Sequence, residues 1–139
     1  MRQVFFNFEI KTSGLKLYEF TDKIYKWIKE NNFNNGIINL SIQHTSASLI
    51  IQENADPDVQ SDLINYFDKV VPMDWELYIH TAEGKDDMPA HIKSALTNNQ
   101  ISLSVKNKGL LLGTWQGLYL FEHRIEKQNR LIVLHYLGD

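Results

Sequence analysis

The sequence of 139 residues contains no cysteine, only three prolines and seven glycines. Without cysteine the chain can form no disulfide, no thiolate nucleophile and no cysteine-based metal site. The few prolines and glycines form no linker between two halves, so we expect one domain over residues 1–139. The lack of cysteine also fits a reducing compartment, and we expect a cytoplasmic protein.

Excess positive charge and long apolar runs are missing as well. The net charge is −3, whereas a general surface for nucleic acid or an anionic membrane needs a basic excess. No stretch approaches about 18 consecutive apolar residues, so we expect no transmembrane helix. The first ten residues alternate and include Glu9, unlike the apolar segment of a secretory signal. We therefore expect no nucleic-acid partner and no membrane association.

The spacing of apolar residues predicts about seven strands and three helices. The predicted strands cover residues 3–11, 37–43, 48–53, 100–105, 109–112, 115–123 and 130–137. Strands dominate the second half of the chain. This order predicts an α+β fold, a single compact domain in which about three helices pack on a largely antiparallel β-sheet or sandwich.

Three segments carry helix signals. Thr21 is expected to cap the first helix, and Asp56-Pro57 is a strong start for the second, with an acceptor at the N-cap and proline at the first position. The second helix has an amphipathic stripe, formed by Val59, Leu63, Tyr66, Phe67 and Val70. The third helix should begin around Pro89 and bury Met88, Ile92, Ala95 and Leu96.

The first segment with chemical potential is His44-Thr45-Ser46-Ala47-Ser48, directly after a predicted strand. Hydroxyl groups and free backbone N–H groups at a strand end suit a phosphate or a carboxylate. The alternative is a turn whose hydroxyls satisfy their own backbone.

The second segment runs from His80 to His91 and contains Glu83, Asp86 and Asp87. Carboxylates bind hard cations and histidines bind transition metals, so the segment could form a metal or acid–base loop. Alternatively, the carboxylates cap the helix and complement its dipole, and His91 is a hydrogen-bonded structural residue.

The third segment, residues 113–124, ends in Glu122-His123-Arg124. In an extended strand Glu122 and Arg124 share one face, about 7 Å apart. We expect Arg124 to bind the anionic part of a ligand and Glu122 to act as a base or a metal ligand. The alternative is an ion pair between these two residues at the sheet edge.

Together the three segments are more specific than any one alone. The blocks QHTSASLIIQENADPDV, EGKDDMPAHIKSAL and LLGTWQGLYLFEHR resemble the signature blocks of the YjbQ-like family, often labelled secondary thiamine-phosphate synthase. The resemblance runs from about residue 4 to residue 138. It implies a compact α+β fold, a homotrimer, a metal- or anion-binding site between subunits and a thiamine-phosphate-synthase-like activity.

The resemblance carries over residue by residue. The matching positions are His44, Thr45, Ser46, Ser48, Asn54, Asp56, His80, Glu83, Gly84, Asp86, Asp87, Pro89, His91, Lys93, Thr114, Gln116, Glu122, His123 and Arg124. Two positions depart from the family pattern. Thr81 stands where an aspartate is usual, and Leu137 stands in place of the glutamine of a Gln-Gly-Glu-like ending.

Roles follow from this resemblance and from side-chain chemistry. The expected catalytic residues are His91, Glu122, Arg124 and Asp87. The expected ligand-binding residues are Thr45, Ser46, Ser48, Lys93, Thr114, Gln116 and Asp86. A divalent metal, zinc or magnesium, is expected on His44, His91 and His123, with His80 as the weaker fourth candidate. The three histidines are far apart in sequence, so only the fold could bring them together.

Two functions remain open on this basis. The first is an enzyme that acts on phosphorylated small molecules, with a metal, arginine and lysine neutralising a diphosphate leaving group. The second is a non-catalytic homotrimeric module that binds a metal or a small anion. A third reading assigns the polar motifs to the subunit interface.

Overall fold

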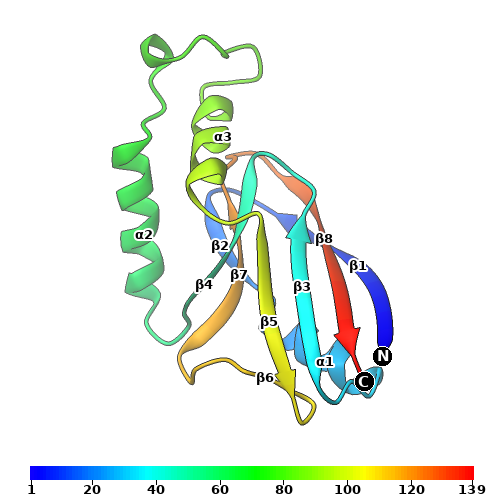
Figure 1. Cartoon of the computed structure of the whole chain (residues 1–139). Coiled ribbons are helices and arrows are strands. Elements are labelled where there is room, and N and C mark those ends of the chain that lie inside the picture. The colour runs from blue at the N-terminus through cyan, green and yellow to red at the C-terminus, as the bar shows by residue number, and fades with distance from the viewer.

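The computed structural model describes residues 1–139 as eight strands, three α-helices and one short 3-10 helix (Figure 1). The strands are β1 (Arg2–Thr12), β2 (Lys16–Glu19), β3 (Gly36–Ile42), β4 (Ala47–Glu53), β5 (Gln100–Lys106), β6 (Gly109–Leu110), β7 (Gln116–Glu122) and β8 (Gln128–Gly138). The helices are α1 (Thr21–Glu30), α2 (Pro57–Val70), η1 (Trp75–Leu77) and α3 (Asp87–Leu96). None of the helices is both long and apolar enough to span a membrane.

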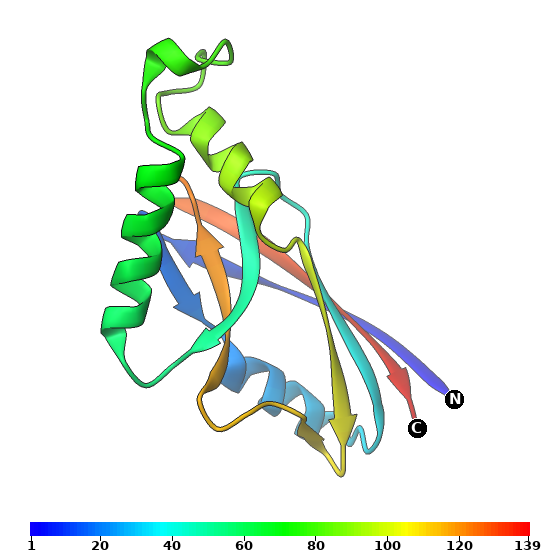
Figure 2. The ribbon, with the colours of Figure 1, turned by 60° about the vertical axis from the view of Figure 1, so that its left-hand side comes forward.

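The strands form two antiparallel sheets. The larger sheet has the order β1-β8-β3-β5-β6, and the smaller has the order β2-β7-β4. Figure 2 shows the two sheets crossing, with α1 against the lower end of the larger sheet and α2 outside the smaller one. The α+β fold expected from the sequence is therefore confirmed.

The main core lies on the inner face of the larger sheet. The alternation of the strands places Ile38 and Leu40 of β3 beside Tyr136 and Leu134 of β8, and all four side chains are buried. Helix α1 covers this face, with Ile24, Trp27 and Ile28 buried. A period of two in the strands and of 3.6 in the helix therefore supplies one continuous core.

Strand β7 is buried on both of its faces. Leu118 and Leu120 point into the main core. Tyr119 and Phe121 point the other way, into a smaller cluster against α2, where the Phe121 and Phe67 rings lie 5.5 Å apart. Strand β7 is therefore fixed between the two cores, and its last residues are held in place from both sides.

Two of the three predicted helix starts need comment. Asp56 caps α2 as expected, because its side chain accepts a hydrogen bond of 2.9 Å from the Asp58 N–H. The N-cap expected at Thr21 is wrong, since Phe20 occupies that position. The Thr21 hydroxyl instead donates to Glu19 and accepts from the Leu118 N–H, which joins the start of α1 to β7.

The buried side expected for α3 is also wrong. Its buried residues are Asp87, Pro89, Ala90 and Lys93, whereas Leu96 is 59% exposed. The helix turns its polar side inward because Arg124 and Asp68, which come from other elements, pair with Asp87 and Lys93. Strand β2 was not predicted, and β6 is shorter than residues 109–112.

The double burial of β7 makes Leu120 a test of the fold. We expect Leu120→Ala to lower the free energy of unfolding by about 2–5 kcal/mol, because it removes a fully buried side chain and leaves a cavity. Urea unfolding followed by circular dichroism measures this loss. Leu111→Ala is the matched control, since Leu111 is 58% exposed, and should change stability by less than about 0.5 kcal/mol. Equal losses in both variants would contradict the packing described.

Candidate functional site

Three segments of the chain meet beside α3. They are the connection between β3 and β4, the segment leading into α3, and the end of β7 with the residues that follow it. The contacts are direct, because His91 of α3 bonds to the Thr45 carbonyl and Arg124 donates to the Glu83 carbonyl. The fold therefore brings together the three motifs singled out in the sequence.

A cluster of two histidines and one aspartate lies at this meeting point. The Oδ2 atom of Asp87 is 2.7 Å from Nε2 of His80 and 3.2 Å from Nε2 of His91. Asp87 and His91 are one turn apart on α3, while His80 comes from the loop that follows η1. The ligand atoms of these three residues lie within 4.8 Å of one another, a grouping that could hold a metal ion.

The other ring nitrogen of His91 fixes how this histidine can act. Nδ1 lies 2.9 Å from the Thr45 carbonyl oxygen, which can only accept a hydrogen bond. Nδ1 therefore carries a proton, and in the neutral ring Nε2 presents a lone pair toward the Asp87 carboxylate. Either a second proton or a cation must separate these two acceptors. A histidine whose Nδ1–H is held by a backbone carbonyl is the usual arrangement for a metal ligand through Nε2.

Arg124 holds the acidic loop in place. Its Nη1 donates to Asp87 Oδ1 at 2.5 Å, its Nε donates to Asp86 Oδ2 at 3.0 Å, and its Nη2 donates to the Glu83 carbonyl. Burial raises the pKa of Asp86, but the Ile125 N–H and the Arg124 guanidinium outweigh this, and the pKa lies below its ordinary value. Burial opposes the charge on Arg124, but Asp86 and Asp87 raise its pKa. Asp86 therefore stays charged, and Arg124 holds both carboxylates in place.

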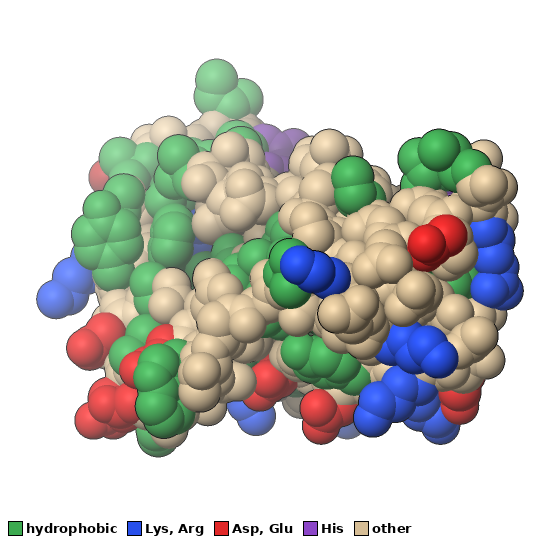
Figure 3. All heavy atoms as spheres, turned by 60° about the horizontal axis from the view of Figure 1, so that its bottom comes forward, with side chains coloured by type: hydrophobic (Ala, Val, Ile, Leu, Met, Phe, Trp, Pro, Cys, Tyr) green, Lys and Arg blue, Asp and Glu red, His purple; other side chains and the backbone are tan.

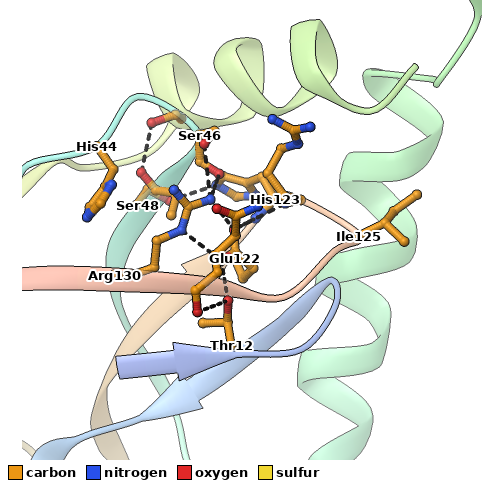
Figure 4. Close-up of polar contacts among 12 residues, drawn as sticks. Thr12, His44, Ser46, Ser48, Glu122, His123, Ile125 and Arg130 are labelled. Carbon is orange, nitrogen blue, oxygen red and sulfur yellow. Dashed lines mark hydrogen bonds and ion pairs between the residues drawn. The ribbon is translucent and has the colours of Figure 1, made fainter. Parts of the chain in front are cut away.

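Glu122 is fully buried and pairs with Arg130 (Figure 4). Arg130 Nη2 donates to Oε2 at 2.6 Å and Arg130 Nε donates to Oε1 at 2.8 Å, while the Thr12 hydroxyl donates to Oε1. The backbone N–H groups of His123 and Arg124 bond to Oε2. The ion pair expected as an alternative between Glu122 and Arg124 is therefore wrong. Because Glu122 is fully buried, its carboxylate cannot contact a ligand directly as a base in this structure.

His123 and Ser48 form a second buried pair. The Ser48 hydroxyl lies 2.9 Å from His123 Nε2, and His123 Nδ1 has no hydrogen-bond partner. Burial, and after it the nearby charges of Lys93 and Arg130, lower the pKa of His123 to about 3. This imidazole is therefore neutral at physiological pH.

His44 lines a polar hollow beside the cluster. Its Nε2 accepts a hydrogen bond of 2.8 Å from the Leu131 N–H, and burial together with Arg130 lowers its pKa. The hollow has a volume of about 240 Å³ and is lined by His44, Thr45, His91, Ser94, Ala95 and Asn99. Within one chain, the structure thus groups His91 with His80 and Asp87, a set that could hold a metal ion, and gives His44 and His123 other partners.

The remaining expected ligand-binding residues fall into two groups. Ser46 and Lys93 lie near the site but are engaged, Ser46 by Arg130 and Lys93 by Asp68 at 2.5 Å. Gln116 begins β7 and Thr114 precedes it, so Gln116 lies about 20 Å along the strand from Glu122. The Gln116 side chain accepts from the Gly113 N–H and closes a local turn there.

Arg130 is the main residue that the sequence reasoning missed. The signal for it was present, because Arg130 shares an inward face of β8 with Ile132, Leu134 and Tyr136. A charged residue at a core-facing strand position must find a buried partner of opposite charge. On β7, Glu122 lies on the same core-facing side of the strand as Leu118 and Leu120.

The fold and the cluster define a class: a two-sheet α+β protein with a histidine–aspartate cluster at one end, beside a polar hollow. The family model described as UPF0047 protein YjbQ-like matches residues 6–139, and the chain belongs to this family. The resemblance read from the three sequence blocks is therefore confirmed.

Relatives and solved structures agree with this assignment. A UPF0047 protein of Synechocystis is 46% identical over 130 residues, which cover 94% of this chain and 88% of the relative. The UPF0047 protein YjbQ of Escherichia coli O157:H7 is 42% identical over 130 residues, covering 93% and 92% of the two chains. The crystal structure of an uncharacterized YjbQ/UPF0047 protein from Clostridium acetobutylicum has a TM-score of 0.86 at 31% identity, covering 95% of this chain and 99% of that chain. The names of these relatives assign no activity.

The neutral state of His123 predicts a pH dependence of stability. The unfolded chain takes up a proton at this histidine near its ordinary pKa of 6.5, whereas the folded chain does so only near about 3. Stability from this group is therefore complete above pH 6.5 and lost as the pH falls toward 3, by at most about 1.4 kcal/mol per pH unit.

Urea unfolding at about pH 7 and about pH 4.5 measures this loss, and His123→Gln, which cannot titrate, is the comparison. We expect a smaller loss between the two pH values in the variant than in the parent. The same loss in both proteins would show that His123 is not held neutral.

Proposed function

We propose that this protein binds one divalent transition metal per chain through His80, Asp87 and His91. The observation that carries the proposal is the His91 ring, whose Nδ1–H is held by the Thr45 carbonyl while Nε2 faces a carboxylate. A cation between these acceptors removes their repulsion. Asp87 is itself held by Arg124, which is the kind of supporting contact that orients metal ligands.

The donor set favours zinc over magnesium. Two imidazole nitrogens and one carboxylate oxygen suit zinc, whereas magnesium prefers oxygen ligands and retains water. Ligand atoms at about 2.1 Å from a tetrahedral zinc lie about 3.4 Å apart. The distances of 2.7 and 3.2 Å from Asp87 to the two histidines are slightly shorter, so an ion would need these two distances to lengthen slightly.

With three protein ligands, a fourth position remains for water or a substrate. The hollow beside His91 and Thr45 offers space for a small polar molecule. A bound metal would supply Lewis-acid stabilisation of an anionic oxygen. We therefore propose a phosphorylated or anionic small molecule as the ligand, and the thiamine-phosphate-synthase-like activity implied by the family resemblance as the candidate reaction.

The cationic side chains near the site are already paired with acids, so they contribute less to binding an anionic ligand. Arg124 and Lys93 are both paired with acids, at Asp86, Asp87 and Asp68. This favours the second candidate function, a metal-binding protein without turnover, more than the sequence alone does. In either case we propose a homotrimer. Helix α2 has no buried residue, and the apolar side chains of Tyr66, Val70 and Leu96 are exposed.

Metal content tests the proposal. Tag-free protein should contain about one zinc per chain by elemental analysis, and light scattering of the same preparation should give the mass of a trimer. Asp87→Asn and His80→Ala should each lower the metal affinity at least about tenfold. His44→Ala is the matched control and should keep the metal, because its ring nitrogen bonds to the Leu131 N–H. Metal retained in both site variants but lost in the control would contradict the assignment.

Turnover separates the two candidate functions. If the protein is an enzyme, a pyrimidine diphosphate and a thiazole phosphate should yield product and pyrophosphate at a rate proportional to the protein concentration. His91→Ala should abolish this rate, since it removes the ligand that also borders the hollow. His135→Ala is a control on the outer strand face. Zinc binding without product formation would support the metal-binding function and contradict the catalytic one.

A further inference from the structure

A second hollow lies between the edge strand β1 and helix α1, on the lower part of the molecule, away from α3 (Figure 1). Its volume is about 270 Å³, and its lining consists of Phe6, Phe8, Lys23, Lys26, Trp27 and Glu30. This is slightly below the roughly 300–1,000 Å³ of small-molecule sites. The hollow therefore fits one or two amino-acid side chains.

The floor of the hollow is aromatic and its rim is charged. Phe6 stacks on Trp27 with 5.8 Å between ring centroids, and Phe6 is 44% exposed. On the rim, Lys26 already pairs with Glu30 at 3.7 Å. Lys23 has no acidic partner, and its ammonium lies 5.1 Å from the centre of the Phe8 ring. Figure 3, a view from this end, shows hydrophobic side chains at the surface among basic and acidic ones.

The outer edge of strand β1, beside the hollow, has no strand paired with it. Strand β1 is the edge of its sheet and pairs only with β8. No backbone group of β1 forms a backbone hydrogen bond outside that ladder. The centre of the strand, Val4–Phe8, contains neither proline nor charge, which are the usual devices that protect an edge from pairing.

We propose that this groove binds an extended peptide segment of another protein by strand addition to β1. An apolar side chain of the peptide lies in the hollow between Phe6, Phe8 and Trp27, and an acidic side chain next to it pairs with Lys23. Addition of a strand to a free sheet edge is a recurring mode of peptide recognition, in which the backbone supplies affinity and side-chain pockets supply specificity.

The charges favour such a peptide over a second copy of this chain. Because side chains alternate along a strand, Arg2 and Ile10 share the groove side of β1 with Phe6 and Phe8. A second copy that continued the sheet with its α1 on the same side would bring Arg2 of its β1 to the groove, and that side of β1 carries no acid. Its positive charge would then face Lys23 and Lys26.

A blocked, fluorescently labelled peptide tests the proposal with the intact protein. The probe has seven residues, all threonine except for a central leucine and a glutamate two positions to either side. Fluorescence anisotropy should show saturable binding below about 1 mM. Lys23→Glu should weaken binding at least about fivefold, as expected for reversal of one surface charge pair. Lys29→Glu, an exposed lysine of α1 outside the groove, should leave binding unchanged.

Three further peptides complete the experiment. Replacing the glutamates by lysine should weaken binding as Lys23→Glu does. Of two peptides N-methylated on the backbone, one at the leucine and one at the threonine that follows it, one should lose binding, because only alternate residues of an added strand donate to β1. The proposal is overturned by absence of saturable binding, by equal weakening in Lys23→Glu and Lys29→Glu, or by tolerance of both N-methyl groups. It is also overturned if light scattering shows that the peptide acts only by displacing a second copy from β1.

Discussion

The buried ion pair between Glu122 and Arg130 is the interaction on which the rest of the structure depends. Glu122 ends the central strand of the smaller sheet, and Arg130 lies near the start of the strand next to the edge of the larger one. Thr12 at the end of β1 and Ser46 in the connection between β3 and β4 complete the network. Removing one partner of such a pair costs about 3–5 kcal/mol, because it leaves a buried charge alone. The pair therefore joins the two sheets at this end of the molecule.

The position of the histidine–aspartate cluster follows from this pair through a short chain of contacts. Glu122 bonds to the backbone of Arg124, whose guanidinium in turn holds Asp86 and Asp87. Asp87 then sets the distance between His80 and His91. Glu122 and Arg124 thus serve the site by positioning it, although neither needs to contact a ligand. This explains why these residues occur together in the sequence block that resembles the family.

Most of the fold was predicted from patterns among neighbouring residues. The features that were not predicted depend on contacts between residues far apart in the sequence. The cap at Asp56 and the alternation of the strands depend on neighbouring residues, and both were predicted correctly. The buried side of α3 was wrong because Asp87 meets Arg124, 37 positions further on. Sequence reasoning placed His80 last among the metal candidates because it depended on the missing acidic neighbour at position 81. In the structure the acid beside His80 is Asp87, which comes from α3.

The balance of charge would link the proposed metal binding to the proposed anion binding. The nearest cations of the chain, Arg124 and Lys93, are each paired with a carboxylate, so they add little attraction for an anion. Two neutral imidazoles and one carboxylate around a divalent ion leave a net positive charge of one, next to a hollow lined by neutral groups. Without the ion, Asp87 contributes a negative charge there. An anionic ligand would therefore bind only after the metal, and the same coupling means that the ligand would tighten metal binding by the same factor.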